Sequence, residues 1–474
     1  MRFPPAPRHS AAWSTWQWLR APYPYLDLLV KDLGETFTMR LLRFKLVVFT
    51  NPEHVKEVFL DNGETLEAGR FNQTLAPLLG DRSVLMVDGQ KHRRKRKLLL
   101  PPFLGERMQV YGKTMLDVTD DAIDSFPHGK AFSLHEPMQD ITLRVIVRTV
   151  FGFEGARLEE MVRVTKRVLE LATRPCSSFA RMTRTWPPLL IPFMQVDLGR
   201  FSHYGRFLRA VEESDGILYD EIRRRRRDGT RGPDILSLLL DARDEDGSPM
   251  SDEELRDELV TLLVAGHETS ATGLTWAMRW LLESPEILHD LRAELEALGP
   301  DPAPEALAKS ALLDAVAREA LRLVPVIPIV GRVLAQDRTI GGWDLKKDDI
   351  VVCSIYLAQR RPDAFPDPER FDPRRFLDKK LSAYEFFPFG GGIRRCIGMA
   401  FALYEMKMVL ARLATRTELA LEQGRALGMS RRSITITPTD GLRVILRKRR
   451  PRASPSGSPR AAVAKTPEMQ SAAT

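Results

Sequence analysis

The chain has 474 residues, 43% of them hydrophobic and 28% charged, a composition typical of globular proteins. Its formal net charge is +8. Residues 447–474 contribute +6 of this charge, because they hold seven basic residues and one acid. The remainder is near neutral, which argues against a nucleic-acid-binding protein. Three widely spaced cysteines without a Cys-x-x-Cys pair argue against a disulfide framework and a structural zinc site.

Single hydrophobic cores usually stop growing near about 250–300 residues, so a buried cofactor would help to explain a chain of this length. No stretch approaches the roughly 20 consecutive apolar residues of a membrane span, and the N-terminus lacks the apolar region of a signal peptide. We therefore expect a cytoplasmic protein without a transmembrane segment. The expected organisation is an extension without a membrane anchor (1–27), a main domain (28–446) and a basic, disordered tail (447–474).

In chain order, β-prone residues at 37–49 predict a hairpin, and Asn51-Pro52-Glu53 predicts a helix start. Residues 62–89 are expected to form a loop, with a helix beginning near Gln90. Helical periodicity then predicts helices at 134–151, 201–227, 252–283 and 285–297. Later we expect strands at 333–340, 343–345 and 350–354, a Pro-rich meander at 362–388, and a last helix at about 396–414. Helices with segregated strands indicate the α+β class, mainly α.

The strongest chemical signal is the segment PFGGGIRRCIG at 388–398. A thiolate at a helix N-terminus is stabilised by the helix dipole and by free N–H groups, so the pKa of Cys396 should fall. Glycines let backbone amides approach the sulfur, and Gly398 leaves room for a flat macrocycle. The alternative is a structural cysteine beside a phosphate-binding loop. It is disfavoured because the segment lacks G-x-G-x-x-G and a surrounding strand–helix unit.

The pattern Phe389-x-x-Gly392-x-Arg394-x-Cys396-x-Gly398 resembles the haem-binding loop of the cytochromes P450. The resemblance extends over about 28–446. It implies a triangular, helix-rich body with small β-sheets, in which haem b lies between a long helix and the helix that follows the cysteine. It also implies that Cys396 is the proximal iron ligand, that Phe389 packs near its sulfur, and that Arg394 pairs with a haem propionate.

A second motif is Ala265-Gly-His-Glu-Thr-Ser270, within the predicted helix 252–283. Ala265, Glu268 and Thr269 lie on or near one helix face, and a neighbouring carboxylate and hydroxyl can relay protons. By resemblance, Ala265 contacts the haem, Thr269 is the hydroxyl of oxygen activation, and Glu268 belongs to its proton supply. The alternative is a threonine bonded to its own helix and a surface glutamate. His267 is expected to be structural.

Two further sets gain meaning from the resemblance. Glu319 and Arg322 would form a buried pair completed by Arg370, which locks the meander around the cysteine loop. His92 and Arg96, four residues apart on one helix face, match a family pair that holds the propionates, and Arg332 matches another propionate arginine. The alternative for the basic run around His92 is a solvated surface.

The resemblance implies a monooxygenase, and the Glu268–Thr269 pair argues against the alternatives of a peroxygenase and a non-catalytic haem sensor. Electrons from NAD(P)H would arrive through a ferredoxin or flavodoxin with its reductase, steered by basic residues at 91–97, 394, 395 and 407. We expect a monomer and a lipophilic substrate such as a fatty acid, terpenoid or steroid. The apolar pocket would be lined by residues 176–198 and by Phe71, Leu85, Met86, Val326, Ile327 and Ile329.

Overall fold

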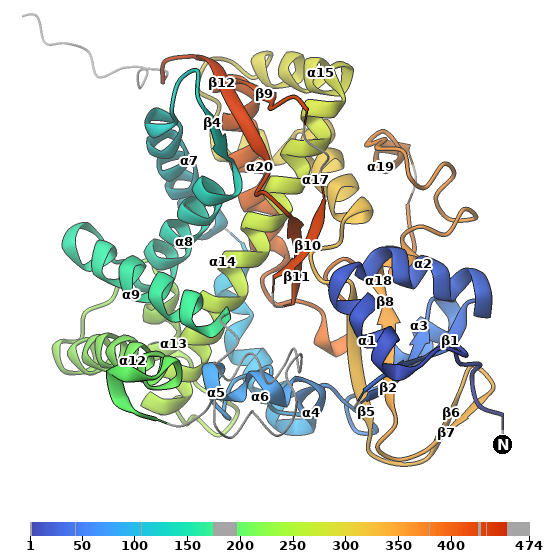
Figure 1. Ribbon diagram of the computed structural model, residues 1–474. Helices are drawn as coiled ribbons and strands as arrows, with labels where there is room; N and C mark the ends of the chain where they lie inside the picture. The colour runs from blue at the N-terminus through green and yellow to red at the C-terminus, as the bar shows by residue number, and fades with distance from the viewer. Residues whose placement is uncertain are drawn as a thin grey trace, which may run out of the picture.

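The computed structural model describes residues 2–42, 44–105, 107–173, 197–378, 380–424, 428–432 and 434–452. Its helices gather around α14 (Asp252–Glu283), which runs through the middle of the molecule, while the largest sheet lies to one side (Figure 1). The strands are segregated from the helices. The expected α+β, mainly α, architecture is therefore confirmed.

The largest sheet brings together distant parts of the chain. Its strands, in spatial order, are β1 (Thr36–Leu41), β2 (Phe44–Phe49), β8 (Ile350–Ser354), β5 (Ile329–Leu334) and β3 (Leu66–Glu67). β1 and β2 form the expected hairpin, β2 runs parallel to β8, and β8 runs antiparallel to β5. A separate hydrophobic core packs this sheet against α3 (Pro52–Phe59), whose first turn is capped by Asn51 as expected. Arg332 therefore lies on β5, a strand that is held between β8 and β3 in this sheet.

Two helices precede this sheet in the chain, α1 (Ala11–Arg20) and α2 (Pro22–Leu33). Trp18, Tyr23 and Leu26 are buried in the main core, and the Tyr23 hydroxyl donates to the carbonyl of Pro325 at 2.7 Å. The residues that were expected to form an extension therefore pack into the main domain. The helix α2 continues through residue 28, so no domain boundary lies there.

Helices build most of the main core. Those before α14 are α4 (Ala68–Asn72), α5 (Ala76–Leu79), α6 (Gly89–Leu99), α7 (Arg107–Ser125), α8 (His135–Phe151), α9 (Gly155–Thr173), α12 (His203–Asp228) and α13 (Ile235–Asp241). Those after it are α15 (Pro285–Glu296), α16 (Pro304–Lys309), α17 (Ala311–Leu323), α18 (Ile355–Ala358), α19 (Arg375–Asp378) and α20 (Met399–Arg416). Short 3-10 turns lie at Gln73–Leu75, Pro101–Phe103, Gly199–Phe201 and Gly392–Arg394. α14 packs against α8, α17 and α20, so it connects the two halves of the helical body.

Smaller sheets complete the molecule. They contain β4 (Ala131–Ser133), β12 (Arg443–Arg449) and β9 (Thr417–Leu421), then β6 (Arg338–Ile340) with β7 (Trp343–Leu345), and β10 (Met429–Arg432) with β11 (Thr435–Pro438). The backbone N–H of Arg450 donates to the carbonyl of Arg416 at 2.8 Å. Regular structure therefore continues beyond residue 446, where the tail was expected to begin. Residues 453–474 and most of the predicted pocket segment 176–198 lie outside the described residues.

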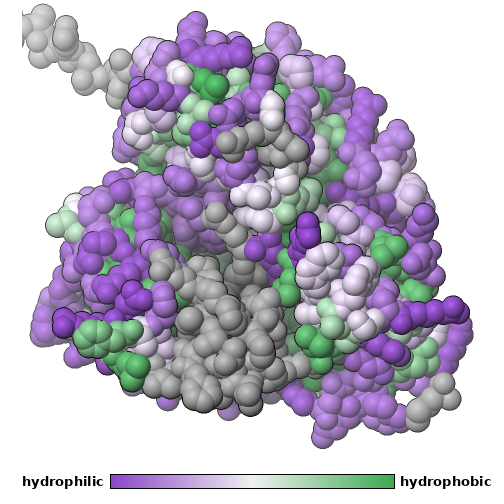
Figure 2. All heavy atoms as spheres, viewed as in Figure 1, coloured by the Kyte–Doolittle hydropathy of each residue, from purple (hydrophilic) through white to green (hydrophobic). Residues whose placement is uncertain are grey.

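The long helices match their predictions closely, and α14 has the predicted bounds. Two shorter predictions are wrong: 62–89 contains β3, α4 and α5, and 333–340 divides between β5 and β6 in different sheets. Within the described ranges, no helix combines the length and apolar character needed to cross a membrane. On the face in Figure 2, hydrophilic residues dominate the described surface, and hydrophobic residues form separate patches.

Candidate active site

The cysteine lies in a tight loop that ends at α20. Gly390 and Gly392 have φ angles of 69° and 62°, in the left-handed region that favours glycine. A Cβ atom at Gly392 would lie 2.0 Å from the carbonyl oxygen of Phe59, at the end of α3. The Cys396 N–H donates to the carbonyl of Phe389 at 3.0 Å. The glycines therefore allow the loop to pass close to α3, and the Phe389 backbone fixes the cysteine.

The Cys396 side chain lies within the fold and is nevertheless accessible. Ala265 is also exposed, although it lies in the middle of α14 and has buried neighbours along that helix. α14 packs against α20, so these two accessible residues belong to neighbouring parts of the fold. At Gly398, the N-cap of α20, a Cβ atom would meet only the Cys396 sulfur within 4 Å, at 4.0 Å. The absence of a side chain at Gly398 suits a flat group that approaches the sulfur.

Burial raises the pKa of the Cys396 thiol, against the lowering effects of the Gly398 N–H and the Arg96 guanidinium. The predicted fall is therefore wrong for the protein chain alone, since removal from water outweighs the helix terminus. A thiol that coordinates a metal ion is deprotonated by the metal, and an N–H group near its sulfur tunes the metal–thiolate bond. The surroundings of Cys396 therefore fit a metal ligand better than a free reactive cysteine.

Four predicted propionate contacts come together near the cysteine: His92 and Arg96 from α6, Arg332 from β5, and Arg394 from the cysteine loop. Burial, together with repulsion from Arg394, Arg96 and Arg332, lowers the pKa of His92 to about 3. Burial also lowers the pKa of Arg332, and it lowers that of Arg394 to about 10. The solvated-surface alternative therefore does not describe this cluster.

The cluster is poor in counter-charges. Arg394 pairs with Asp88 and donates to the carbonyls of Val84 and Val87. Arg96 makes no hydrogen bond or ion pair with the described residues, and the buried Nδ1 atom of His92 has no hydrogen-bond partner there. Three guanidinium groups against one carboxylate leave two positive charges, which the two propionates of haem b would balance. The residues present therefore fit this cofactor.

On α14, Thr269 and Glu268 face different neighbours. The Thr269 hydroxyl donates to the carbonyl of Ala265 at 2.6 Å, the bond named in the structural alternative. Glu268 is not a surface residue of the kind that this alternative required, because its carboxylate contacts His135 and Gln139 on α8. The Thr269 hydroxyl keeps free lone pairs beside the exposed Ala265, so it can still act as an acceptor.

His267 has the structural role that was expected. Its Nδ1 atom lies 3.1 Å from the hydroxyl of Thr142, which also contacts the His267 carbonyl at 3.1 Å. Burial lowers the pKa of His267 to about 4. His267 is therefore a neutral, buried histidine that fastens α14 to α8.

Glu319 and Arg322 form the predicted buried pair, with two bonds of 2.7 and 2.9 Å. The predicted role of the Arg370 side chain is wrong. Arg370 contributes only its backbone carbonyl, which accepts from Arg322 at 3.1 Å. The arginine that reaches Glu319 is Arg375, whose Nε atom lies 3.1 Å from the carboxylate. The two arginines stand in similar sequences, Pro368-Glu-Arg-Phe and Pro373-Arg-Arg-Phe. The second of these sequences was the signal that could have identified Arg375.

Gln359 also belongs to this network and was not predicted to do so. Its amide nitrogen donates to the carbonyls of Leu321 and Arg322 at 3.1 and 3.2 Å. Its amide oxygen accepts from the N–H of Phe387 at 3.2 Å. Gln359 therefore ties the end of α17 to the segment that enters the cysteine loop.

The six predicted pocket residues are buried or half-buried in or against the main core. The Phe71 ring packs so closely on β5 that a Cβ atom at Gly331 would lie 2.4 Å from it. Leu85 and Met86 belong to the loop before α6, which is fastened to α14 by the Val84 N–H and the Glu258 carboxylate, 3.1 Å apart. Val326, Ile327 and Ile329 lie at the start of β5 and just before it.

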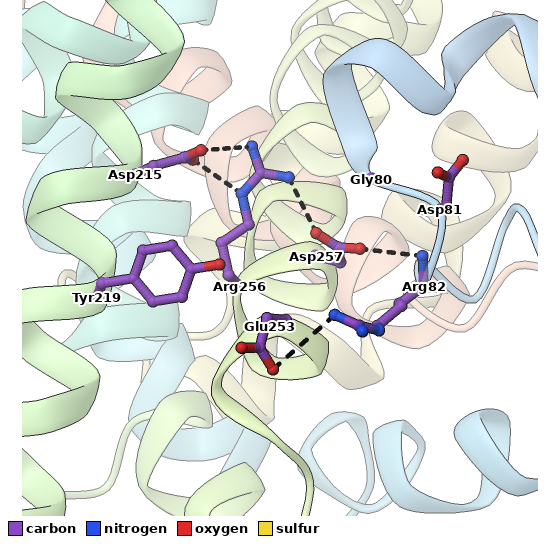
Figure 3. Close-up of a pocket in the computed structure, with 8 residues that line it drawn as sticks. All are labelled: Gly80, Asp81, Arg82, Asp215, Tyr219, Glu253, Arg256 and Asp257. Carbon is purple, nitrogen blue, oxygen red and sulfur yellow. Dashed lines mark hydrogen bonds and ion pairs between the residues drawn. The ribbon is translucent and has the colours of Figure 1, made fainter.

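A polar surface cleft of about 510 Å³ lies between the loop after α5, α12 and the start of α14 (Figure 3). Arg256 pairs with Asp215 at 2.8 Å and with Asp257 at 2.9 Å, and Arg82 lies 3.8 Å from Glu253. None of the described residues that line this cleft belongs to the predicted site. Its ion pairs connect α12 and the loop after α5 to α14, so we assign the cleft a structural role.

Comparisons with known proteins identify a family. The family model described as Cytochrome P450 matches residues 4–444. Cytochrome P450 135B1 of Mycobacterium tuberculosis is 36% identical over 456 residues, which cover 95% of this chain and 92% of that protein. Cytochrome P450 138 of Mycobacterium bovis is 32% identical over 453 residues, with 95% and 97% covered.

Solved structures give the same result. A cyanobacterial CYP120A1 with bound retinoic acid has a TM-score of 0.80 and 26% identity, over 94% of this chain and all of that one. The haem domain of cytochrome P450DA has a TM-score of 0.83 and 25% identity, over 96% and 100%. With an accessible cysteine inside the fold and a cationic cluster suited to haem b, the chain belongs to the cytochrome P450 family of haem-dependent monooxygenases.

Proposed function

We propose that this monooxygenase inserts oxygen into a lipophilic small molecule such as a fatty acid, terpenoid or steroid, by hydroxylation or epoxidation. Electrons from NAD(P)H would come from a separate ferredoxin or flavodoxin with its reductase. We further propose that the protein acts as a monomer in the cytoplasm. When bound, haem b supplies the oxygen chemistry, and the thiolate ligand favours cleavage of the O–O bond.

The residues that would hold the cofactor follow from their contacts. Cys396 would bind the iron, with Phe389 and Gly398 shaping the space around the sulfur. His92, Arg96, Arg332 and Arg394 would hold the propionates. This assignment is supported by the cationic cluster, whose two excess positive charges have no ion-pair partner among the described residues.

The Thr269–Glu268 pair would take part in proton transfer. The Thr269 hydroxyl donates a hydrogen bond to the Ala265 carbonyl, so its oxygen can accept a hydrogen bond from another donor. Glu268 is the adjacent ionisable group and would serve as a source of protons there. The two residues would therefore act together as hydroxyl and acid.

One observation supports the substrate class: the residues proposed to line the pocket are apolar, and Phe71, Leu85, Ile327 and Ile329 are only partly buried against the core. The retinoic acid bound by the cyanobacterial relative is a lipophilic molecule of the size that such pockets accept. Arg70, the cation next to Phe71 in the chain, pairs with Asp348 at 2.7 Å on the surface. We therefore propose recognition by apolar contact.

The test is an optical titration of the haem-loaded protein with a fatty acid, a terpenoid and a steroid. We expect at least one to shift the haem absorption band at micromolar concentration. Ile327→Phe should weaken that ligand about tenfold or more by overfilling the pocket. The matched control is Ile217→Phe on α12, because Ile217 is also half-buried against the core. Equal effects of both substitutions, or no shift with any lipophilic ligand, would contradict the proposal.

A further inference from the structure

Two acids in the first turns of α14, Glu254 and Glu258, contact the helix that carries His92 and Arg96. The ammonium of Lys95 on α6 lies 3.2 Å from a carboxylate oxygen of each acid. The side chain of Lys95 is 6% exposed, and that of Glu258 is fully buried. Lys95 directly precedes Arg96 in the chain, so these contacts fix the backbone of α6 beside a proposed propionate contact.

Glu254 supplies a charge that balances Lys95. Burial alone would raise the pKa of Glu254, but its contacts with the Ser251 N–H and with two cations of α6 outweigh burial, and the pKa is lowered. The second of these cations is Arg94, which donates to Glu254 at 3.0 Å and to Asp244 at 2.7 Å. α6 is therefore joined to α14 by two cations that do not belong to the cationic cluster.

Glu258 also holds the loop that Arg394 binds. Its Oε2 atom accepts from the Val84 N–H at 3.1 Å, whereas its Oε1 atom faces Lys95. The carbonyl of Val84 accepts from Arg394 at 3.2 Å, and the carbonyl of Val87 accepts from Arg394 at 2.6 Å. The backbone of Val84 thus connects Glu258 to Arg394, as Lys95 connects it to α6.

This arrangement fastens the cluster without neutralising it. Like charges repel, so the segments that carry Arg96 and Arg394 need an attachment that does not depend on the cluster itself. An acid paired directly with these arginines would compete with a propionate for their charge. Glu258 instead contacts Lys95 and a backbone N–H group, which leaves the cluster its charge.

We propose that Glu258 and Lys95 are positioning residues for the haem propionates: they hold α6 and the loop before it so that Arg96 and Arg394 converge on the cofactor. The two excess positive charges of the cluster stay available to the propionates. Such outer contacts keep a binding site preorganised. This inference rests on the proposed role of the cluster in haem binding.

The first test is haem transfer at pH 7 from the oxidised, haem-loaded protein to an excess of apomyoglobin, which measures how firmly the cofactor is held. Lys95→Met keeps a long apolar side chain and removes the ammonium. It should speed transfer about tenfold, as for other outer residues that orient the ligands of a cofactor. The matched control is Lys97→Met on the same helix, whose exposed ammonium pairs with Glu245 at 2.9 Å. It should change the rate less than about twofold. Equal rates for Lys95→Met and the unchanged protein would overturn the inference.

The second test separates the two contacts of Glu258. Glu258→Leu removes both and should also speed haem transfer about tenfold. Glu258→Gln keeps an amide oxygen that can accept from the Val84 N–H, so it should release haem more slowly than Glu258→Leu. Equal rates for these two variants would refute the part assigned to the Val84 contact, and with it the proposal.

A last pair of controls distinguishes positioning from a general loss of stability. Val164→Ala truncates a fully buried core residue of α9 and should lower stability without speeding haem transfer. If it speeds transfer as much as Lys95→Met does, the inference fails. Arg96→Leu and Arg394→Leu test the cluster itself. Unchanged transfer in both would overturn the proposed propionate contacts as well, whereas unchanged transfer in Lys95→Met alone overturns only this inference.

Discussion

At the scale of single residues, the Glu319 carboxylate shows how one buried group can organise a long irregular segment. Its oxygens accept from Arg322, from the N–H of Asp372 at 2.9 Å and from Arg375 at 3.1 Å. Arg322 extends the network to the carbonyls of Gln359 and Pro368. The meander before the cysteine loop is therefore fixed by polar contacts with α17.

The two arginines near Glu319 should differ in their effect on stability. Arg375→Ala removes a charged hydrogen bond to a fully buried carboxylate, which should lower the free energy of unfolding by about 1.5–3 kcal/mol. Arg370→Ala is the matched control, because it keeps the backbone carbonyl and removes only an exposed side chain, with an expected change within about 0.5 kcal/mol. Urea unfolding followed by the haem band measures both. A larger loss for Arg370→Ala would contradict the assignment.

The residues found from the sequence are those that short motifs specify. Cys396 is marked by its glycines and Glu319 by its spacing to Arg322. His135 could not be found in this way, because nothing in the sequence near residue 135 refers to Glu268, which is 133 positions away. Its contact with Glu268 depends on the packing of α8 on α14, a tertiary contact without a local pattern. The same is true of Gln359, whose partners lie at the end of α17 and just before the cysteine loop.

At the scale of elements, α14 was predictable because its ends carry strong local signals. Ser251 and Glu254 form a capping box, with both reciprocal bonds present. The segment 62–89 lacks such signals, and its short helices depend on tertiary bonds: Asp88 accepts from the N–H groups of Ala68 and Gly69, each at 2.9 Å. Helices this short are unstable alone, so their sequence resembles a loop.

The loop before α6 is fastened to α14 by a buried acid whose ionisation should affect stability. Glu258 is fully buried, accepts from the Val84 N–H at 3.1 Å, and lies 3.2 Å from the ammonium of Lys95. Burial raises its pKa to about 7, against the lowering effect of Lys95. Because the folded pKa exceeds the unfolded value of about 4.3, the folded state binds more protons between these values. The contribution of Glu258 to stability is therefore complete below pH 4 and declines as pH rises to about 7.

Replacing this acid by its amide should remove that pH dependence. Relative to the unchanged protein, Glu258→Gln should gain up to roughly 3 kcal/mol of unfolding free energy between pH 4.5 and pH 8, at about 1.4 kcal/mol per pKa unit. Urea unfolding across this pH range measures the difference. The control is Glu283→Gln at the other end of α14, where the acid is partly exposed and pairs with Arg279. Parallel pH curves for Glu258→Gln and the unchanged protein would show that Glu258 is not the titrating group.

At the scale of the whole molecule, the basic run at 91–97 is less available to a partner than its sequence suggests. Arg93 pairs with Glu64 and Lys97 with Glu245, while Lys95 is buried beside Glu258. The steering role expected of this run stays a prediction, and most of its side chains are paired or buried. Lys91 and Arg395 remain exposed, without an ion pair to any described residue.

If an acidic ferredoxin or flavodoxin docks beside the cysteine loop, Arg395 should steer it. Arg395→Glu should slow reduction of the haem by a ferredoxin about tenfold at low ionic strength, because one favourable charge becomes repulsive. The difference should shrink toward 0.5 M salt, where the screening length falls to only a few ångströms. The control is Arg223→Glu, which changes the net charge equally but lies on α12, a helix alongside α9 (Figure 1). If Arg223→Glu slows reduction as much as Arg395→Glu, steering depends on total charge and not on this surface. A rate independent of salt in the unchanged protein would show that electrostatic steering does not operate.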